Sequence, residues 1–125
     1  MTYLDTHVVV ALYERELSPY SARALAAMDK EDDLRISPMV LLELQYLFEF
    51  KRIKVPAARI VGTLQQDIGL QVCEAPFPEV AGKALAERWT RDPFDRIIVA
   101  QARLSSAALI TRDRHILARY KPALA

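Results

Sequence analysis

The sequence has very little cysteine and no long uninterrupted apolar run. Cys73 is the only cysteine among 125 residues, which excludes an internal disulfide and a thiolate cluster for zinc. The N-terminal stretch MTYLDTHVVVALYERE has no basic region, and Asp5, Thr6 and His7 interrupt its apolar residues. This stretch is typical of neither a signal peptide nor a membrane span, so we expect a cytoplasmic protein with no membrane partner.

The sequence also lacks a large excess of either charge, since its net charge is +1. The distribution is nevertheless uneven: residues 1–82 carry 8 basic and 12 acidic side chains, whereas residues 83–125 carry 9 basic and 4 acidic ones. Such asymmetry is a weak indication of a polyanionic partner. A solvated basic face is its commoner cause, so charge alone does not assign a nucleic-acid ligand.

Short apolar runs alternate with longer helical patterns along a chain that is 52% hydrophobic and 26% charged. We predict strands at 2–5, 34–37, 70–75 and 107–111, and helices at 20–31, 38–52, 56–68, 77–89 and 93–106. Segment 6–14 stays open, because its β-branched residues can also prolong the first strand. The alternation predicts one α/β domain over residues 1–125, with a parallel central sheet of four or five strands and helices on both faces.

Polar side chains follow two of the predicted strands. Asp5 follows TYL, and Thr111, Arg112 and Asp113 follow ALI. In a parallel sheet ligands bind outside the carboxyl ends of the strands, so these residues are expected at one edge. Each aspartate also has a purely structural interpretation, because Asp5 can cap the next helix and Asp113 can shape a turn.

Glu43 lies in the middle of an apolar stripe on the predicted helix 38–52. Its helical neighbours at three and four positions are Met39, Val40, Tyr46 and Leu47. A carboxylate in such surroundings costs several kcal/mol unless it is protonated, paired or bound to a metal. Either Glu43 pairs with an arginine in the core, or the helix presents it to a partly enclosed acidic site.

The segment TRDPFDRIIVAQA places Asp92 and Asp95 around a proline at the start of a predicted helix. Asp92 suits the N-cap, Pro93 suits the first helical position, and a negative charge at Asp95 suits the helix dipole. Local structure alone can therefore explain both acids.

The remaining acids suggest a second interpretation, in which Asp5, Glu43, Asp95 and Asp113 converge. Clustered carboxylates repel one another and are tolerated mainly when a cation lies among them. A set of oxygen ligands without cysteine or a histidine pair suits a hard ion such as Mg²⁺ or Mn²⁺. Such an ion can hold a phosphate oxygen and activate water for attack on phosphorus.

The chain resembles the PIN-domain ribonucleases, and in particular the toxin of a VapBC toxin–antitoxin pair. The motifs YLDTH, LLEL, RDPFDRIIVAQA and ALITRD occur in the order and approximate spacing of that family, and the resemblance covers essentially the whole chain. It implies a single PIN-like nuclease domain that hydrolyses RNA phosphodiester bonds and leaves a 3′-hydroxyl and a 5′-phosphate. RDPFDRIIVAQA is the most specific of the four motifs.

The resemblance also implies roles for individual residues. Asp5, Asp95 and Asp113 hold one or two Mg²⁺ or Mn²⁺ ions, and Glu43 completes the cluster and helps to position the attacking water. The other residues near the site are Asp92 as a further acid, Thr111 as a hydrogen-bond donor, and Arg96 and Arg112 as contacts for RNA phosphate or partners of a site carboxylate. Many relatives carry histidine where this chain has Thr90. This difference argues against a base or an RNA contact at position 90, but it does not affect the metal site.

The implied partners are an RNA substrate, a cognate VapB-like antitoxin and a second copy of the chain. The apolar helices at 38–52 and 56–68 offer more nonpolar surface than a small core requires, which favours a homodimer and an antitoxin groove. Two alternatives remain at this point. A catalytically inactive PIN-like module that binds RNA or protein needs no charge cluster, and a phosphoryl-receiver domain needs an aspartate after its middle strand, which this chain lacks.

Overall fold

The computed structural model describes all 125 residues and contains a parallel sheet of five strands. The strands are β1 (Thr2–Leu4), β2 (Leu34–Ile36), β3 (Gln71–Val72), β4 (Ala108–Ile110) and β5 (Ala123–Leu124). Their order in the sheet is β3-β2-β1-β4-β5, so β1 lies at the centre. Tyr3 of β1 pairs with Arg35 on one side and with Leu109 on the other. The predicted α/β class and parallel sheet are confirmed.

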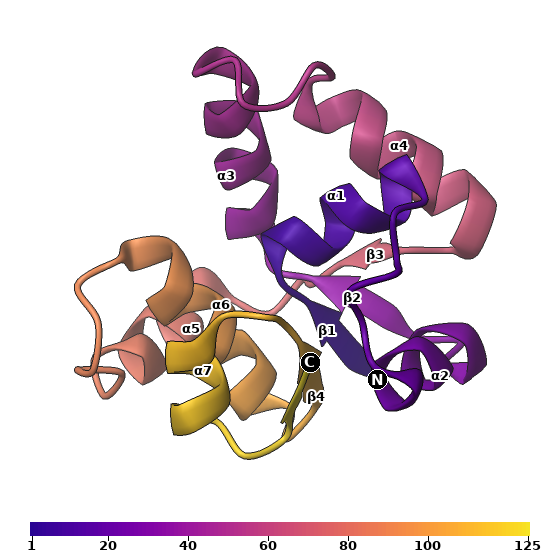
Figure 1. Cartoon of the computed structure of the whole chain (residues 1–125). Coiled ribbons are helices and arrows are strands. Elements are labelled where there is room, and N and C mark those ends of the chain that lie inside the picture. The colour runs from indigo at the N-terminus through magenta and orange to yellow at the C-terminus, as the bar shows by residue number, and fades with distance from the viewer.

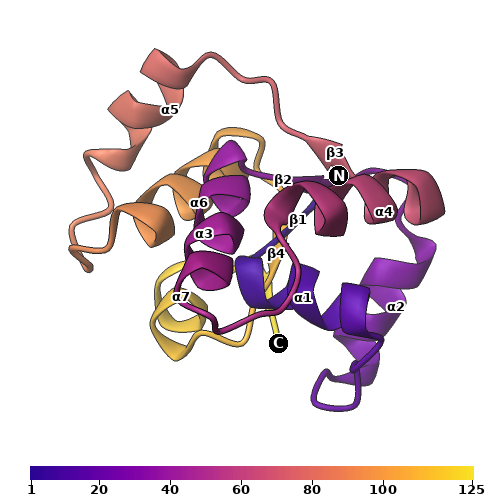
Figure 2. The same ribbon diagram turned by 90° about the horizontal axis from the view of Figure 1, so that it is seen from above.

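Seven helices surround this sheet: α1 (Thr6–Glu14), α2 (Ala22–Lys30), α3 (Pro38–Glu49), α4 (Ala57–Ile68), α5 (Phe77–Ala84), α6 (Pro93–Leu104) and α7 (Arg114–Arg119). Figure 1 shows α1 and α4 on one side of the sheet and α5, α6 and α7 on the other. Seen from above, α3 stands between the two groups, and it contacts α1, α4 and α6 (Figure 2). None of the helices is both long enough and apolar enough to cross a membrane.

The direction of the chain changes at β1, and this change creates the crevice that holds the site. From β1 the chain moves through β2 to the edge strand β3, and it then returns to β4 on the other side of β1. The connections after β1 and β4 therefore diverge at their carboxyl ends. The backbone N–H of Asp5 still donates to the carbonyl of Ile110 over 3.0 Å, which keeps the two strand ends together. A ligand site is expected at such a switch point.

Segment 6–14, which the sequence left open, is the helix α1. The side chains of Val8 and Val9 are fully buried and belong to the main core, so tertiary packing offsets the low helix propensity of β-branched residues. Arg15 ends the helix in the left-handed region, with φ of 59° and its N–H donating to the carbonyls of Ala11 and Leu12.

Two predictions on the C-terminal half were incomplete. Helix α7 and strand β5 were not predicted, because their 6 and 2 residues are too short for a periodic pattern. The predicted helix 77–89 ends at Ala84 instead. Beyond it the chain turns Glu87 inward, where its carboxylate accepts hydrogen bonds from Arg103 Nε and Trp89 Nε1, both over 2.6 Å. This ion pair anchors the loop that leads to α6.

Candidate acidic site

Asp5 is the buried centre of the site, with only 4% of its surface exposed. Each carboxylate oxygen accepts one hydrogen bond: Oδ1 from the backbone N–H of Thr6 over 2.8 Å, and Oδ2 from the hydroxyl of Thr111 over 2.7 Å. Because only one donor reaches each oxygen, lone pairs remain for a further partner. The structural alternative for Asp5 also holds, since this residue is the N-cap of α1.

The end of β4 supplies Thr111 and Asp113. Thr111 is fully buried, and its hydroxyl oxygen accepts the backbone N–H of Asp113 over 3.0 Å while its proton is donated to Asp5. Asp113 caps α7, and Oδ1 alone accepts the backbone N–H groups of His115 and Ile116. Its Oδ2 makes no hydrogen bond within the chain, so capping leaves one oxygen of Asp113 available.

Glu43 reaches the site from the middle of α3 and has no arginine partner. None of the ion pairs in the structure includes its carboxylate. The hydroxyl of Thr6 instead donates to Oε1 of Glu43. Burial raises the pKa of Glu43 and the charges of Asp5 and Asp92 raise it further, whereas the Thr6 hydrogen bond opposes this shift. Of the two interpretations of Glu43, the structure favours the partly enclosed acidic site.

The start of α6 brings Asp92 and Asp95 to the same place. Asp92 is the N-cap, as predicted, and its Oδ1 accepts the backbone N–H of Phe94 over 2.8 Å and that of Asp95 over 3.3 Å. The hydroxyl of Thr90 accepts the backbone N–H of Asp92 over 3.1 Å. Thr90, which stands where many relatives have histidine, thus helps to shape the helix start. The Asp95 side chain accepts no hydrogen bond within the chain.

The acids from these separate segments line one pocket of about 290 Å³, whose walls are Asp5, Thr6, His7, Glu43, Leu47, Asp92, Asp95 and Asp113. The pKa of Asp95 is raised to about 7, first by burial and then by the negative charges of its neighbours, Asp92, Asp5, Asp113 and Glu43. The effect of one charge on another falls with distance, so these carboxylates lie near Asp95. All four predicted acids, and Asp92 with them, therefore meet at the carboxyl ends of β1 and β4.

The donor set fits a hard cation. Every polar side chain that the pocket offers, apart from His7, presents oxygen, and a cation would offset the negative charges that, after burial, raise the pKa of Asp95. No group of three acidic, histidine or cysteine side chains is already spaced to hold a metal ion. Binding of an ion therefore requires side-chain adjustment around it.

Two polar residues that sequence patterns did not assign to the site also line the pocket, Thr6 and His7. Thr6 holds Glu43, and its position directly after Asp5 at the start of α1 was the available signal. His7 is exposed at the rim: Nε2 accepts the backbone N–H of Arg112 over 2.9 Å, and Nδ1 lies 3.7 Å from Oδ2 of Asp5. Because Nε2 is an acceptor, the proton of the neutral ring is on Nδ1, on the side of Asp5.

The two predicted arginines lie in different settings. Arg96 donates from Nε to the carbonyl of Ala84 and from Nη2 to that of Leu85, each over 3.2 Å, and so ties α6 to the end of α5. Arg112 is exposed, and its guanidinium lies 5.9 Å from the ring centre of Tyr20. Neither arginine forms an ion pair with a site carboxylate.

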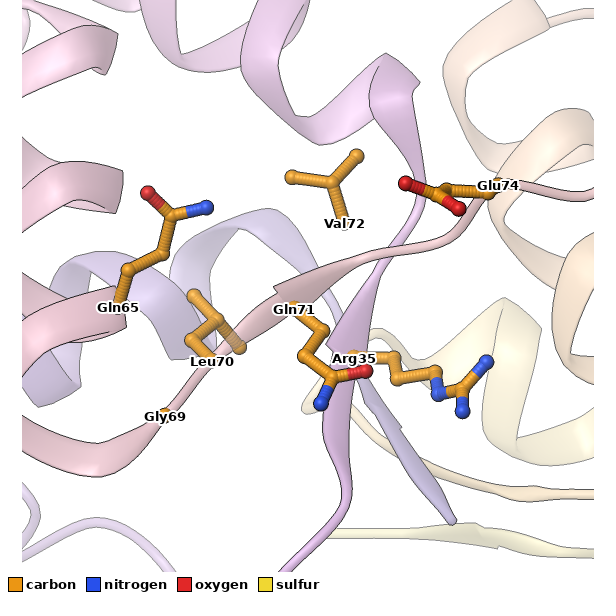
Figure 3. A pocket seen from close by; sticks show the side chains of 7 residues that line it. All are labelled: Arg35, Gln65, Gly69, Leu70, Gln71, Val72 and Glu74. Carbon is orange, nitrogen blue, oxygen red and sulfur yellow. The ribbon is translucent and has the colours of Figure 1, made fainter.

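A larger pocket, of about 600 Å³, lies beside the edge strand β3 and lacks this chemistry. Figure 3 shows Arg35 and Gln71 on one side of β3 and Val72 on the other. Arg35 already donates to Asp33, from Nε over 2.7 Å, and Glu74 is the only acid in the lining. The smaller acidic pocket is therefore the stronger candidate for catalysis.

Comparison with known proteins agrees with this geometry. Residues 2–122 match the profile of the family described as PIN domain. The chain belongs to the PIN-domain family. It is 31% identical over 121 residues to the protein named ribonuclease VapC22 of Mycobacterium tuberculosis (strain ATCC 25618 / H37Rv). The aligned residues make up 95% of this chain and 92% of the relative. The resemblance seen in the sequence motifs is confirmed, and a phosphoryl-receiver domain is excluded.

Solved structures share the PIN fold at lower identity. A toxin–antitoxin complex from Klebsiella pneumoniae matches with a TM-score of 0.70 and 19% identity, over 100% of this chain and 97% of the other. VapBC2 from Rickettsia felis, solved with a DNA fragment of its promoter, matches with a TM-score of 0.67 and 20% identity, over 99% and 96% of the two chains. At this identity the likeness supports the arrangement of the PIN domain rather than its activity.

Proposed function

We propose that this PIN domain is a metal-dependent endoribonuclease and the toxin of a toxin–antitoxin pair. The observation that carries the proposal is the convergence of Asp5, Glu43, Asp95 and Asp113 in one pocket at the switch point of the sheet. The similarity to ribonuclease VapC22 over nearly the whole chain supports RNA as the substrate. A site built only to bind a partner gains nothing from four mutually repelling carboxylates.

The cofactor in this proposal is Mg²⁺ or Mn²⁺, held by Asp5, Asp95 and Asp113, with Glu43 completing the cluster. When bound, such an ion supplies positive charge that polarises the phosphate and lowers the pKa of water. The free Oδ2 of Asp113 and the carboxylate of Asp95, which accepts no hydrogen bond, are among the oxygens that capping leaves available.

The side chains of this chain then position the reactants. Glu43 orients the attacking water and accepts its proton, and the Thr6 hydroxyl fixes the Glu43 carboxylate in direction. The hydroxyl of Thr111, at the end of β4, fixes the Asp5 carboxylate by donating to its Oδ2. Water adds to phosphorus, the bond from phosphorus to the 3′ oxygen breaks, and that oxygen takes up a proton from solvent, so that the products are a 3′-hydroxyl and a 5′-phosphate. Asp92 adds negative charge at the rim, and the exposed Arg112, whose backbone N–H donates to His7 of the pocket, is a contact for RNA phosphate.

The proposed protein partners are an antitoxin and a second copy of the chain. The resemblance to a VapBC complex supports an antitoxin partner. We place that antitoxin over the acidic pocket, with a basic side chain against the carboxylates, because their negative charge favours such a contact. Exposed apolar residues on two neighbouring helices, Leu42 of α3 and Ile68 of α4, support a homodimer.

Incubation of the purified protein with single-stranded or looped RNA tests the proposed activity. Cleavage is expected with Mg²⁺ or Mn²⁺ and not in EDTA, and 5′-phosphate ends are expected on the products. Asp95→Asn is the matched inactive variant. Full cleavage in EDTA, or binding of RNA without any cleavage, contradicts the proposal, and the second result favours the inactive binding module.

A further inference from the structure

A second pocket adjoins the acidic site between α3 and α6. Its volume is about 420 Å³, within the range of roughly 300–1,000 Å³ for ligand sites. Glu43, Leu47 and Asp92 belong to the walls of both pockets, so the two are adjacent. The walls that the acidic pocket does not share are Tyr46, Phe50, Arg52 and Phe94, which we call the aromatic subsite.

Two of the three rings of the aromatic subsite, those of Tyr46 and Phe50, are open to solvent, and that of Phe94 is half-buried. Tyr46 and Phe94 meet edge to face, with ring centres 5.6 Å apart and an angle of 85° between the rings. Tyr46 nevertheless remains 44% exposed and Phe50 remains 75% exposed. Exposed apolar rings that are gathered beside a polar pocket can mark a place where a ligand or partner binds.

The polar groups around these rings indicate what that ligand is. Arg52 is exposed, belongs to the same pocket and forms no ion pair. The walls of the pocket thus include the cation of Arg52 and the aromatic rings of Tyr46, Phe50 and Phe94. The carboxylates of Glu43 and Asp92 lie on the side that it shares with the acidic site. A nucleotide has matching parts: a flat base without charge and a phosphate with negative charge.

We infer that the aromatic subsite binds a base of single-stranded RNA next to the cleaved bond, with Arg52 directed at a flanking phosphate. This inference rests on the proposed ribonuclease activity and adds a place for the substrate. A neutral base can lie beside two carboxylates without charge repulsion, whereas a phosphate in the same position cannot. Stacking on aromatic side chains tolerates any base, so the subsite contributes affinity more than sequence selection.

Two probes of equal charge test the inference: a short fluorescent single-stranded RNA of mixed sequence, and the same ribose–phosphate chain without bases. Binding is measured by fluorescence anisotropy with Mg²⁺ and the Asp95→Asn protein, so that cleavage does not interfere. Base-bearing RNA is expected to bind about tenfold more tightly than the abasic chain. Tyr46→Leu and Phe50→Leu, which keep apolar bulk but remove the ring, are expected to abolish that difference.

Two further variants serve as controls. Phe77 is 61% exposed on α5 and is absent from both pockets, so Phe77→Leu should leave the preference for bases intact. Arg52→Gln should weaken both probes alike and reduce the salt dependence of binding, because its contact is with phosphate.

Equal affinity of the wild-type pocket for the two probes, including failure of both to bind, overturns the inference. The inference is also overturned if Tyr46→Leu and Phe50→Leu convert a dimer to a monomer in sedimentation but leave the preference for bases unchanged. The rings would then contact a second copy of the chain. The proposed activity is measured separately by cleavage with the unmodified site. If the protein cleaves RNA but keeps its preference for bases after Tyr46→Leu and Phe50→Leu, the role of the aromatic subsite is refuted and the proposed activity is not.

Discussion

The hydroxyl of Thr6 donates a hydrogen bond to Oε1 of Glu43 and so connects the first turn of α1 to the middle of α3. Thr6 is also next to Asp5, whose Oδ1 accepts the Thr6 backbone N–H. One residue thereby holds two of the four acids in fixed positions. Because the hydrogen bond lowers the pKa of Glu43 against the effect of burial, it favours the charged form of that carboxylate.

We predict that Thr6→Val lowers metal-dependent RNA cleavage by roughly tenfold, the effect of losing about 1.4 kcal/mol of hydrogen bonding to a charged group. Valine keeps the branched shape and the apolar methyl contact, so the fold should survive. Thr6→Ser restores the hydroxyl and should recover most of the activity. Initial cleavage rates of the three proteins provide the measurement. Equal rates for Thr6→Val and Thr6→Ser would show that the hydroxyl is not needed.

The two aspartates at the start of α6 should respond differently to the same substitution. Asp92→Asn keeps a capping side chain, so the free energy of unfolding should change by less than ~1 kcal/mol and cleavage should fall only partly. Asp95→Asn should remove nearly all cleavage while the fold survives, because its carboxylate makes no capping bond. Cleavage assays and urea unfolding of both variants check this pair. The opposite order of activities would reverse the roles that we assign.

Much of the site was predictable because its residues occupy positions that sequence patterns mark. Asp5 and Asp113 follow apolar strands, and Asp92 and Pro93 form a recognisable helix start. Glu43 was informative because it interrupts the apolar stripe of its helix. A carboxylate in that position is costly unless it is protonated, paired or bound to a metal. In the structure Glu43 lines the acidic pocket, and its partner is the Thr6 hydroxyl and not an arginine.

What could not be predicted depends on contacts between distant segments. Nothing local indicates that Arg96 binds the carbonyls at the end of α5, or that the backbone of Arg112 donates to His7. Glu87 lies in a segment with helical periodicity, but its buried ion pair with Arg103 requires the chain to leave the helix. The proximity of Phe50 to the acidic site likewise depends on how α3 packs beside α6.

Neutralising Glu43 should stabilise the metal-free protein or leave it unchanged. No arginine pairs with Glu43, and the amide oxygen of glutamine can still accept the Thr6 hydroxyl, so Glu43→Gln removes repulsion without removing that hydrogen bond. Thermal melts in EDTA should give Glu43→Gln a Tm at or above that of the wild type. Added Mg²⁺ should raise the wild-type Tm more than that of Glu43→Gln, because a ligand stabilises only the state that binds it. A marked loss of Tm in EDTA would contradict the four-acid site.

The stability of the metal-free protein should fall as the pH rises from about 4 to about 7. The pKa of Asp95 is raised from 3.8 to about 7 in the folded state, so in this window the folded chain retains a proton that the unfolded chain has released. Linkage then lowers the free energy of unfolding as the pH rises, because the native state binds more protons. The pKa of Glu43 is raised as well, which adds a contribution of the same sign.

Urea unfolding in EDTA at several pH values tests this dependence with Asp95→Asn as the matched control. The variant has no carboxyl proton to lose at position 95, so its free energy of unfolding should fall less steeply than that of the wild type between pH 4 and about 7. Mg²⁺ should oppose the wild-type loss near and above pH 7, where ionised carboxylates become available to bind it. Identical pH slopes for the two proteins would mean that Asp95 titrates near its ordinary pKa, and the effect of burial and neighbouring charge on this carboxyl group would then be refuted.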